Sequence, residues 1–413
     1  MPKKLSGIYI KAIIGFFIFG ITVGLILSIS AQRTVGDFDV YYAASQNYLA
    51  RAPIYVPGTG IEEFKYSPLF ALVFSVLTLI GKIPALYLWS ILNILLLYAV
   101  FYLFYRLGLI SFKSAKDFLL VFCLLALTGR FIFAHIKLGQ ANILICFLLT
   151  LAMYCEVKKK EIPVAIALAL SVMIKFFPLL FLAYYILRRR FKLVGLTVLF
   201  IALFLLLPAL YSGLSQNFKY LGEWFSLLRS TPANLFYSTK NSSLLSFFSW
   251  IFIVRNSGYS VLDVTNIPQA LSREVYFFWA LACFVLFCLF FFDVILRKAR
   301  SLNLIYLDYS GLFICGLLFN PLSSLNALVL LFVPYFFILR QLFYFELSKK
   351  RSLAVASLTL LCFIFTMAYN KVFFKDMYQF YQFLQYKLLM WLIILVYGIL
   401  LLLKFSQKTA KAV

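Results

Sequence analysis

Apolar stretches recur along the whole chain, and short polar or basic stretches separate them. The first apolar stretch covers residues 8–30, and others follow as far as Leu403. A membrane-spanning helix needs about 20 apolar residues, because its backbone groups must bond to one another in lipid. The pattern therefore predicts an all-α polytopic membrane protein, with one integral membrane domain over residues 1–413.

Four basic clusters between the apolar stretches orient the predicted helices. They lie at 158–160, 188–192, 297–300 and 349–351. Short loops rich in Lys and Arg stay in the cytoplasm. Placing every cluster there predicts about twelve crossings and two cytoplasmic termini.

Two polar loops then face outward, at 31–66 and 212–242. Segments 67–81 and 243–255 are predicted to enter the membrane without crossing it. Several of the predicted spans are shorter than a full crossing, so local thinning or extra helical turns are expected. The predicted spans after the first are 84–106, 117–129, 141–155, 162–174, 176–187, 193–211, 274–296, 302–319, 325–339, 352–369 and 386–404.

Composition agrees with a membrane protein and excludes other classes. The 413 residues are 64% hydrophobic and 13% charged, so no soluble domain is expected. The net charge of +24 comes from the clusters between spans, and nucleic-acid binding is not predicted. Seven Cys without a Cys-x-x-Cys pair, and a single His, predict neither a disulfide framework nor a metal site. The first apolar stretch is interpreted as an uncleaved anchor.

Two of the 14 acidic residues, Asp37 and Asp39, stand together directly after the first predicted helix. A helix from Asp37 to Leu49 would be amphipathic and lie in the membrane interface. Its apolar face would carry Val40, Tyr41, Ala44 and Tyr48. Asp37 is then either the cap of this helix or a catalytic carboxylate, and the residues alone leave both open.

Four ordered stretches carry a resemblance to a known family. They are Asp37-Phe38-Asp39-Val40-Tyr41-Tyr42-Ala43-Ala44 with Tyr55 and Phe64-Lys65-Tyr66-Ser67-Pro68-Leu69; Gly139-Gln140-Ala141-Asn142; Ile174-Lys175-Phe176-Phe177-Pro178; and Lys240-Asn241-Ser242-Ser243-Leu244. Together they resemble glycosyltransferase family 87, a GT-C-type membrane family of polyprenyl-phosphate-mannose-dependent mannosyltransferases. The resemblance implies a GT-C-like catalytic module at 8–211, an outer loop and re-entrant region at 212–273, and C-terminal helices at 274–413.

The resemblance also implies the reaction and its partners. A sugar would pass, with inversion, from a polyprenyl-phosphate donor to a glycolipid, glycan or protein acceptor among the membrane lipids. Asp37 matches the family's base, which takes the proton of the acceptor hydroxyl. Asp39 stands where the family varies, so at most a supporting role is expected. No metal or other cofactor is expected, because Lys and Arg can neutralise the leaving phosphate.

Four cations are candidates for binding the donor phosphate. Lys175 is the strongest, because a cation inside the apolar stretch 162–187 is costly and Pro178 would open the helix there. Its alternative is a snorkelling side chain in a short loop. Arg130 offers a fork that matches phosphate oxygens, and Lys65 and Lys137 are further candidates.

Polar and aromatic side chains in the same stretches are candidates for binding the sugar or acceptor. Gln140 and Asn142 would either hydrogen-bond sugar hydroxyls or cap a helix. Asn241 joins them, and Tyr41 and Tyr66 are candidates for stacking on a sugar ring. The only His, His135, has no carboxylate near it in sequence and is expected to be structural.

The sequence departs from the family at one place. After Asn320-Pro321-Leu322-Ser323 the family often continues with Trp and His, where this chain has residues 324–327, Ser-Leu-Asn-Ala. No role for His can be carried over there. A transporter or lipid flippase is the alternative function, but it would need polar residues on several spans, and Lys175 stands nearly alone. A scaffold without chemistry would leave Asp37 and Asp39 unexplained.

Overall fold

The computed structural model describes most of the chain. The described residues are 36–55, 63–229, 234–238, 240–257, 273–296, 301–368 and 387–406. The predicted first helix and both termini lie outside them. Every regular element in the described ranges is helical, and the prediction of an all-α polytopic membrane protein is confirmed.

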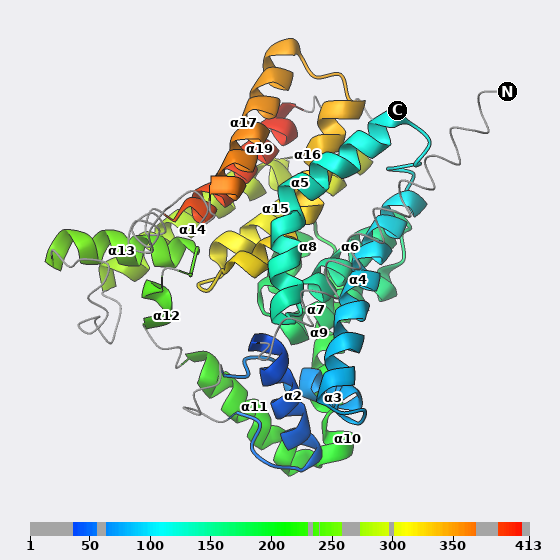
Figure 1. Ribbon diagram of the computed structural model, residues 1–413, viewed down its shortest axis with the longest axis vertical. Helices are drawn as coiled ribbons and strands as arrows, with labels where there is room; N and C mark the ends of the chain where they lie inside the picture. Colours follow the sequence, from blue (N-terminus) through cyan, green and yellow to red (C-terminus); the bar gives the residue numbers. More distant parts are fainter. Residues whose placement is uncertain are drawn as a thin grey trace.

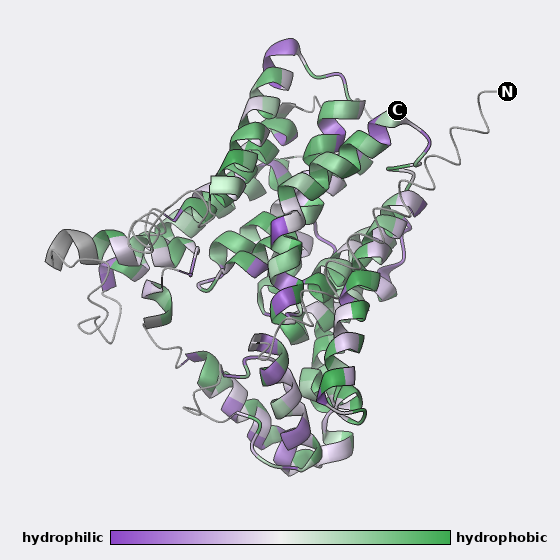
Figure 2. Ribbon diagram, in the orientation of Figure 1, coloured by the Kyte–Doolittle hydropathy of each residue, from purple (hydrophilic) through white to green (hydrophobic). Residues whose placement is uncertain are grey.

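Eight described segments are long and apolar enough to cross a membrane. Figure 2 shows them as mainly hydrophobic ribbons, with hydrophilic residues mostly towards their ends. They are α4 (Lys82–Arg106), α5 (Ala115–Leu138), α9 (Phe191–Leu206) with α10 (Ala209–Ser212), α14 (Arg273–Leu296), α15 (Leu302–Phe319), η3 (Leu325–Leu331) with α16 (Phe332–Tyr344), α17 (Lys349–Ala368) and α19 (Leu388–Ser406).

Shorter apolar helices occupy other predicted segments, and the predicted outer loops also hold helices. The shorter apolar helices are α3 (Pro68–Thr78), α6 (Asn142–Val157), α7 (Glu161–Ile174), and η1 (Phe177–Leu179) with α8 (Leu180–Leu187). The predicted outer loops hold α2 (Gly36–Leu49), α11 (Leu214–Arg229) and α12 (Asn234–Tyr237), and the segment at 243–255 that was predicted to be re-entrant holds α13 (Leu244–Ser257). In Figure 1, α2, α3, α10 and α11 gather at the lower end, and α17 lies towards the upper end.

One predicted boundary is wrong. The span expected to end at residue 129 continues as α5 to Leu138, so Arg130 and Lys137 lie on a helix rather than in a loop. Polar side chains do not stop a helix while its backbone hydrogen bonds can continue. The helix ends at Gly139, which adopts the left-handed conformation (φ 65°) that favours glycine.

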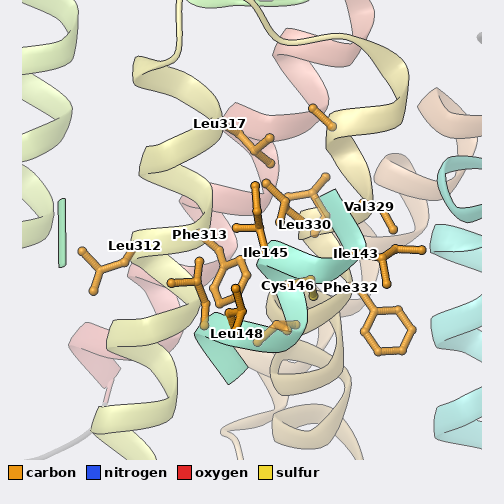
Figure 3. Close-up of a cluster of buried hydrophobic side chains, with 14 of the residues drawn as sticks. Ile143, Ile145, Cys146, Leu148, Leu312, Phe313, Leu317, Val329, Leu330 and Phe332 are labelled. Carbon is orange, nitrogen blue, oxygen red and sulfur yellow. The ribbon is translucent and has the colours of Figure 1, made fainter. Parts of the chain in front are cut away.

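The core is built around α6. Ile143, Ile145 and Leu149 on this helix are fully buried, and α6 packs against α4, α7, η3 and α15. Figure 3 shows its apolar side chains meeting those of α15 and of the η3–α16 segment, such as Phe313 and Phe332. Because α6 is surrounded by protein, its first turn is held at a defined place beside its neighbours.

The predicted helix after Asp37 is α2, and its predicted apolar residues are buried. The buried surface is broader than expected, since Phe38, Tyr42 and Ser45 are buried as well. The α2 helix packs mainly against α3. Rings of Tyr41, Phe70 and Phe74 meet edge to face or stacked, with centroids 5.0–5.8 Å apart. This packing holds α2 beside the bundle and directs its first turn, with Asp37, towards the end of α5.

Candidate active site

The turn between α5 and α6 lies beside the start of α2, and several contacts hold it in place. Gly139 closes α5, and its carbonyl accepts a hydrogen bond of 2.7 Å from the indole Nε1 of Trp89. The backbone N–H of Gln140 donates to the carbonyl of His135 (3.2 Å). On the α2 side, a Cβ added to Gly36 would lie 3.2 Å from Leu138 Cδ2, so the two chains approach closely. The turn is therefore tied to its surroundings.

A continuous line of side-chain hydrogen bonds joins Asp37 to Lys175. Gln140 Nε2 donates to Asp37 Oδ2 at 2.6 Å. Asn142 Nδ2 donates to Gln140 Oε1 at 2.5 Å, and Lys175 Nζ donates to Asn142 Oδ1 at 2.7 Å. Gln140 and Asn142 are buried, whereas Asp37 and Lys175 are partly exposed. We call these four side chains the Asp37–Lys175 line.

Lys175 reaches this line because α7 stops one residue before it. Pro178 has no N–H to donate to the carbonyl of Ile174, and its ring would collide with that carbonyl in a continuous helix. Lys175 accordingly adopts an extended backbone conformation (φ −147°, ψ 150°). The predicted break at Lys175 and Pro178 is confirmed.

Lys65 lies in the same neighbourhood. The backbone N–H of Ser67 donates to the carbonyl of Met173 (3.3 Å), so the segment before α3 runs beside the end of α7. Trp224 of α11 stacks on Phe176, with ring centroids 5.0 Å apart, and its Nε1 donates to the Lys65 carbonyl at 3.1 Å. The structure thus brings two predicted phosphate-binding residues, Lys65 and Lys175, to one side of α7.

The other two predicted phosphate-binding cations are placed differently. Arg130 lies about 12 Å along α5 from Leu138, at 1.5 Å per residue. Its Nη1 donates to the carbonyl of Thr366 in α17 (2.9 Å). Lys137 is in the last turn of α5, and its side chain is exposed. Arg130 is therefore tied to α17.

Asp39 points to a different partner from Asp37. Its Oδ1 lies 3.1 Å from Nζ of Lys82 at the start of α4, and that lysine is 56% exposed. The two acids are two residues apart on a helix and therefore face different directions.

Tyr41 of α2 and Tyr66, which precedes α3, form a buried pair. Their hydroxyl groups are 2.5 Å apart, and their rings meet edge to face. Burial, followed by electrostatic interactions with Tyr66 and Asp37, raises the pKa of Tyr41 well above its ordinary value. Protein covers both rings, which favours a packing role over direct stacking on a sugar.

Asn241 joins two distant parts of the chain. Its Nδ2 donates to the carbonyls of Leu235 and Pro321 (3.2 and 3.0 Å). Its Oδ1 accepts from the backbone N–H groups of Ser243 and Ser323 (3.0 and 3.1 Å). An amide with four such bonds has little capacity left for a sugar hydroxyl, so this arrangement favours a structural role.

The stretch that departs from the family lies against the Asp37–Lys175 line. It begins directly after Ser323, which Asn241 holds, and it leads into η3. The carbonyl of Asn326 accepts a 3.4 Å hydrogen bond from Asn142 Nδ2. Asn142 and Asn326, which are 184 positions apart in sequence, therefore border one region.

Three sets of contacts near the site did not follow from sequence reasoning. Trp89 holds the turn at Gly139, and Trp224 holds the segment at Lys65, as described above. Lys387, just before α19, is buried and donates to the carbonyls of Ser238 and Asn241 (2.9 and 2.8 Å). The sequence carries no spacing signal for such contacts, because each joins segments at least 50 residues apart.

His135 has the structural role expected for it. It is fully buried, and its Nε2 accepts a hydrogen bond of 3.1 Å from the backbone N–H of Ile143 in the first turn of α6. The ring thereby satisfies one of the amides that a helix start leaves open. Within the described residues, no three His, Cys, Asp or Glu side chains gather in a way that would hold a metal ion.

Comparison with protein families gives a match over much of the chain. The sequence profile of glycosyltransferase family 87 matches residues 64–321. That range includes the stretches at 139–142, 174–178 and 240–244, and it begins after Asp37. No curated protein matches this chain.

Proposed function

Because the chain belongs to glycosyltransferase family 87, we propose that it transfers mannose from a polyprenyl-phosphate donor, with Asp37 as general base. The acceptor is a glycolipid, glycan or protein hydroxyl on the extracytoplasmic side of a bacterial cytoplasmic membrane. One observation carries this proposal: Asp37 and Lys175, on separate elements, end on one hydrogen-bonded line. A carboxylate and a cation in one place are the two groups that the reaction requires.

The proposed reaction is a single displacement at the anomeric carbon. Asp37 accepts the proton of the acceptor hydroxyl as that oxygen attacks the anomeric carbon from the face opposite the phosphate. The new carbon–oxygen bond forms as the bond to the phosphate oxygen breaks. The phosphate leaves on its lipid with the bonding electron pair, and the configuration is inverted. The proton remains on Asp37 until solvent removes it.

Cations close to the carboxylate stabilise the charge that develops on the leaving phosphate. Lys175 and Lys65 are the proposed ligands, because both lie beside the end of α7. Lys137, in the last turn of α5, and Arg130, farther back on the same helix, would contact the phosphate only at the edge of such a site. The lipid chain of the donor would remain in the bilayer, where apolar side chains of the bundle are exposed to it.

The test is sugar transfer by purified protein. Wild type would be incubated with radiolabelled polyprenyl-phosphate mannose and extracted bacterial membrane lipids, beside Asp37→Asn. A matched control is Glu63→Gln, which makes the same change at another partly exposed carboxylate of the first outer loop. We expect transfer by wild type and Glu63→Gln and loss of transfer in Asp37→Asn. Equal transfer by all three proteins would exclude Asp37 as the base.

The transporter alternative makes a different prediction in the same preparations. If no protein transfers sugar while vesicles show lipid or solute movement that Lys175→Ala abolishes, the enzyme proposal is wrong.

A labelling experiment tests the side of the membrane. Gln46 is exposed on α2, and Lys158 is exposed in the turn after α6. In intact cells, an impermeant thiol reagent should label Gln46→Cys and spare Lys158→Cys. Protection of Gln46→Cys would contradict an extracytoplasmic Asp37.

A further inference from the structure

The two amides between Asp37 and Lys175 can point in only one direction. A lysine ammonium donates hydrogen bonds and accepts none, so the oxygen of Asn142 must face Lys175. The amide nitrogen of Asn142 then faces Gln140 Oε1. The nitrogen of Gln140 in turn faces Asp37, whose carboxylate accepts. Chemistry alone therefore assigns both amide orientations.

From this direction we propose that Gln140 and Asn142 are positioning residues: they relay the charge of Lys175 to Asp37 and hold its carboxylate ionised and aimed at the acceptor. The proposal deepens the proposed function, since it rests on Asp37 being the base. It replaces the alternative in which these two amides bind sugar hydroxyls.

Burial makes such a relay effective. Asn142 is fully buried and Gln140 is 8% exposed, so water competes little for their hydrogen bonds. In surroundings of low polarity, each polarised hydrogen bond strengthens the next one. The positive charge at Lys175 therefore favours a negative charge at the far end of the line, although no direct ion pair joins the two groups there.

Each amide is also fixed by its backbone. Gln140 follows the left-handed Gly139, and its N–H is bonded to the His135 carbonyl. Asn142 is the first residue of α6, where the His135 ring bonds the next N–H. Lys175 is held extended at the end of α7. The relay is thus built on the ends of three packed helices, which suits groups that must hold a geometry.

Hydrogen-bond capacity points the same way. The oxygen of Asn142 is used by Lys175, and its nitrogen donates to Gln140 and to the Asn326 carbonyl. Gln140 uses its oxygen and one N–H within the line. The amides therefore have few bonding positions left for a sugar, and apart from the bond to Asn326 their side-chain bonds connect Lys175 to Asp37.

The test measures the ionisation of Asp37 without any sugar substrate. A water-soluble carbodiimide and an amine couple to protonated carboxyl groups, and mass spectrometry of the purified full-length protein reads the modification of Asp37 at each pH. The variant Asn142→Asp keeps an acceptor for Lys175 but cannot donate to Gln140 when ionised. The control Asn303→Asp makes the same change at another Gln–Asn side-chain pair, where Gln341 Nε2 donates to Asn303 Oδ1 (2.6 Å).

We expect Asn142→Asp to move half-modification of Asp37 upward by about one pH unit, because the carboxylate loses a donor that favours its charged form. Asn303→Asp should leave the profile unchanged. Gln140→Glu is a second variant that places a like charge beside Asp37, and it should shift the profile in the same direction. Unchanged profiles in both relay variants would overturn the proposal.

A transfer assay separates the relay from the proposed function. If wild type transfers sugar, the relay predicts that Asn142→Asp lowers kcat about 10–100-fold and moves the acid limb of the rate profile to higher pH. A raised KM with an unshifted profile would instead identify Asn142 as a sugar ligand. If wild type transfers nothing, the proposed function fails, and the carbodiimide profiles still decide the relay.

Discussion

Two lysine–aspartate assemblies in the described residues are built in opposite ways. In the candidate active site, two amides separate Lys175 from Asp37. In the bundle, Lys404 of α19 lies 2.9 Å from Asp308 of α15 and 3.5 Å from Asp293 of α14. Lys404 also donates to the carbonyl of Phe290 (3.1 Å), and Tyr184 of α8 donates to Asp308 at 3.2 Å.

The difference shows how the same two residue types serve different purposes. Lys404, Asp308 and Asp293 are at most 3% exposed, and the ion pairs between them join three helices. Asp37 and Lys175 remain partly exposed, and each has contact with the other only through neutral groups. A direct ion pair would lower the reactivity of both charges, whereas a spaced pair keeps a base and a cation available.

The largest effect is expected from removing the proposed base. Asp37→Asn should lower sugar transfer about 1,000-fold, because the attacking hydroxyl loses its proton acceptor. The thermal unfolding temperature of the purified protein should change little, since the replacement is isosteric. A loss of transfer that only follows a loss of folded protein would contradict this assignment.

Breaking the direct pair should affect stability rather than chemistry. Lys404→Met leaves two carboxylates buried without their cation, so the free energy of unfolding should fall by about 3 kcal/mol. Thermal unfolding in detergent measures this. Adding Asp308→Asn should recover part of the loss, and full stability of Lys404→Met alone would show that the pair contributes nothing.

The matching change at Lys175 should lower sugar transfer more than it lowers stability. Lys175→Met keeps the length of the side chain and removes its charge, so transfer should fall about 10–100-fold. Its unfolding temperature should drop less than that of Lys404→Met, because Asp37 is partly exposed and can be hydrated. If Lys175→Met and Lys404→Met lowered the unfolding temperature equally, the proposed difference between the two assemblies would be wrong.

The smallest effect is expected at Asp39. Its partner Lys82 is largely exposed, and exposed ion pairs contribute little. Asp39→Asn should change both sugar transfer and unfolding temperature only slightly, with transfer altered less than about twofold. A loss of transfer approaching that of Asp37→Asn would instead assign Asp39 a direct part in the reaction.

Much of the fold could be predicted from the sequence because the rules concerned are local. Span α15 was predicted at 302–319 and observed there, since Ser301 caps its start and Asn320-Pro321 follows its end. The end of α5 was misplaced by nine residues, because the predicted span ended just before Arg130. Whether a polar residue such as Arg130 finds a partner, as it does at Thr366, depends on neighbours that are distant in sequence.

By itself, the sequence determined that this is a helical membrane protein and that a helix ends at Lys175. It also identified Asp37, Gln140 and Asn142 as candidate site residues. These conclusions follow from hydropathy, from the missing N–H of Pro178 and from ordered motifs. Only the tertiary structure decided that these side chains form one line and that Lys404 belongs to a different assembly. The physical reason is that hydrogen bonds and ion pairs depend on distances of about 3 Å, and packing alone sets such distances between separate helices.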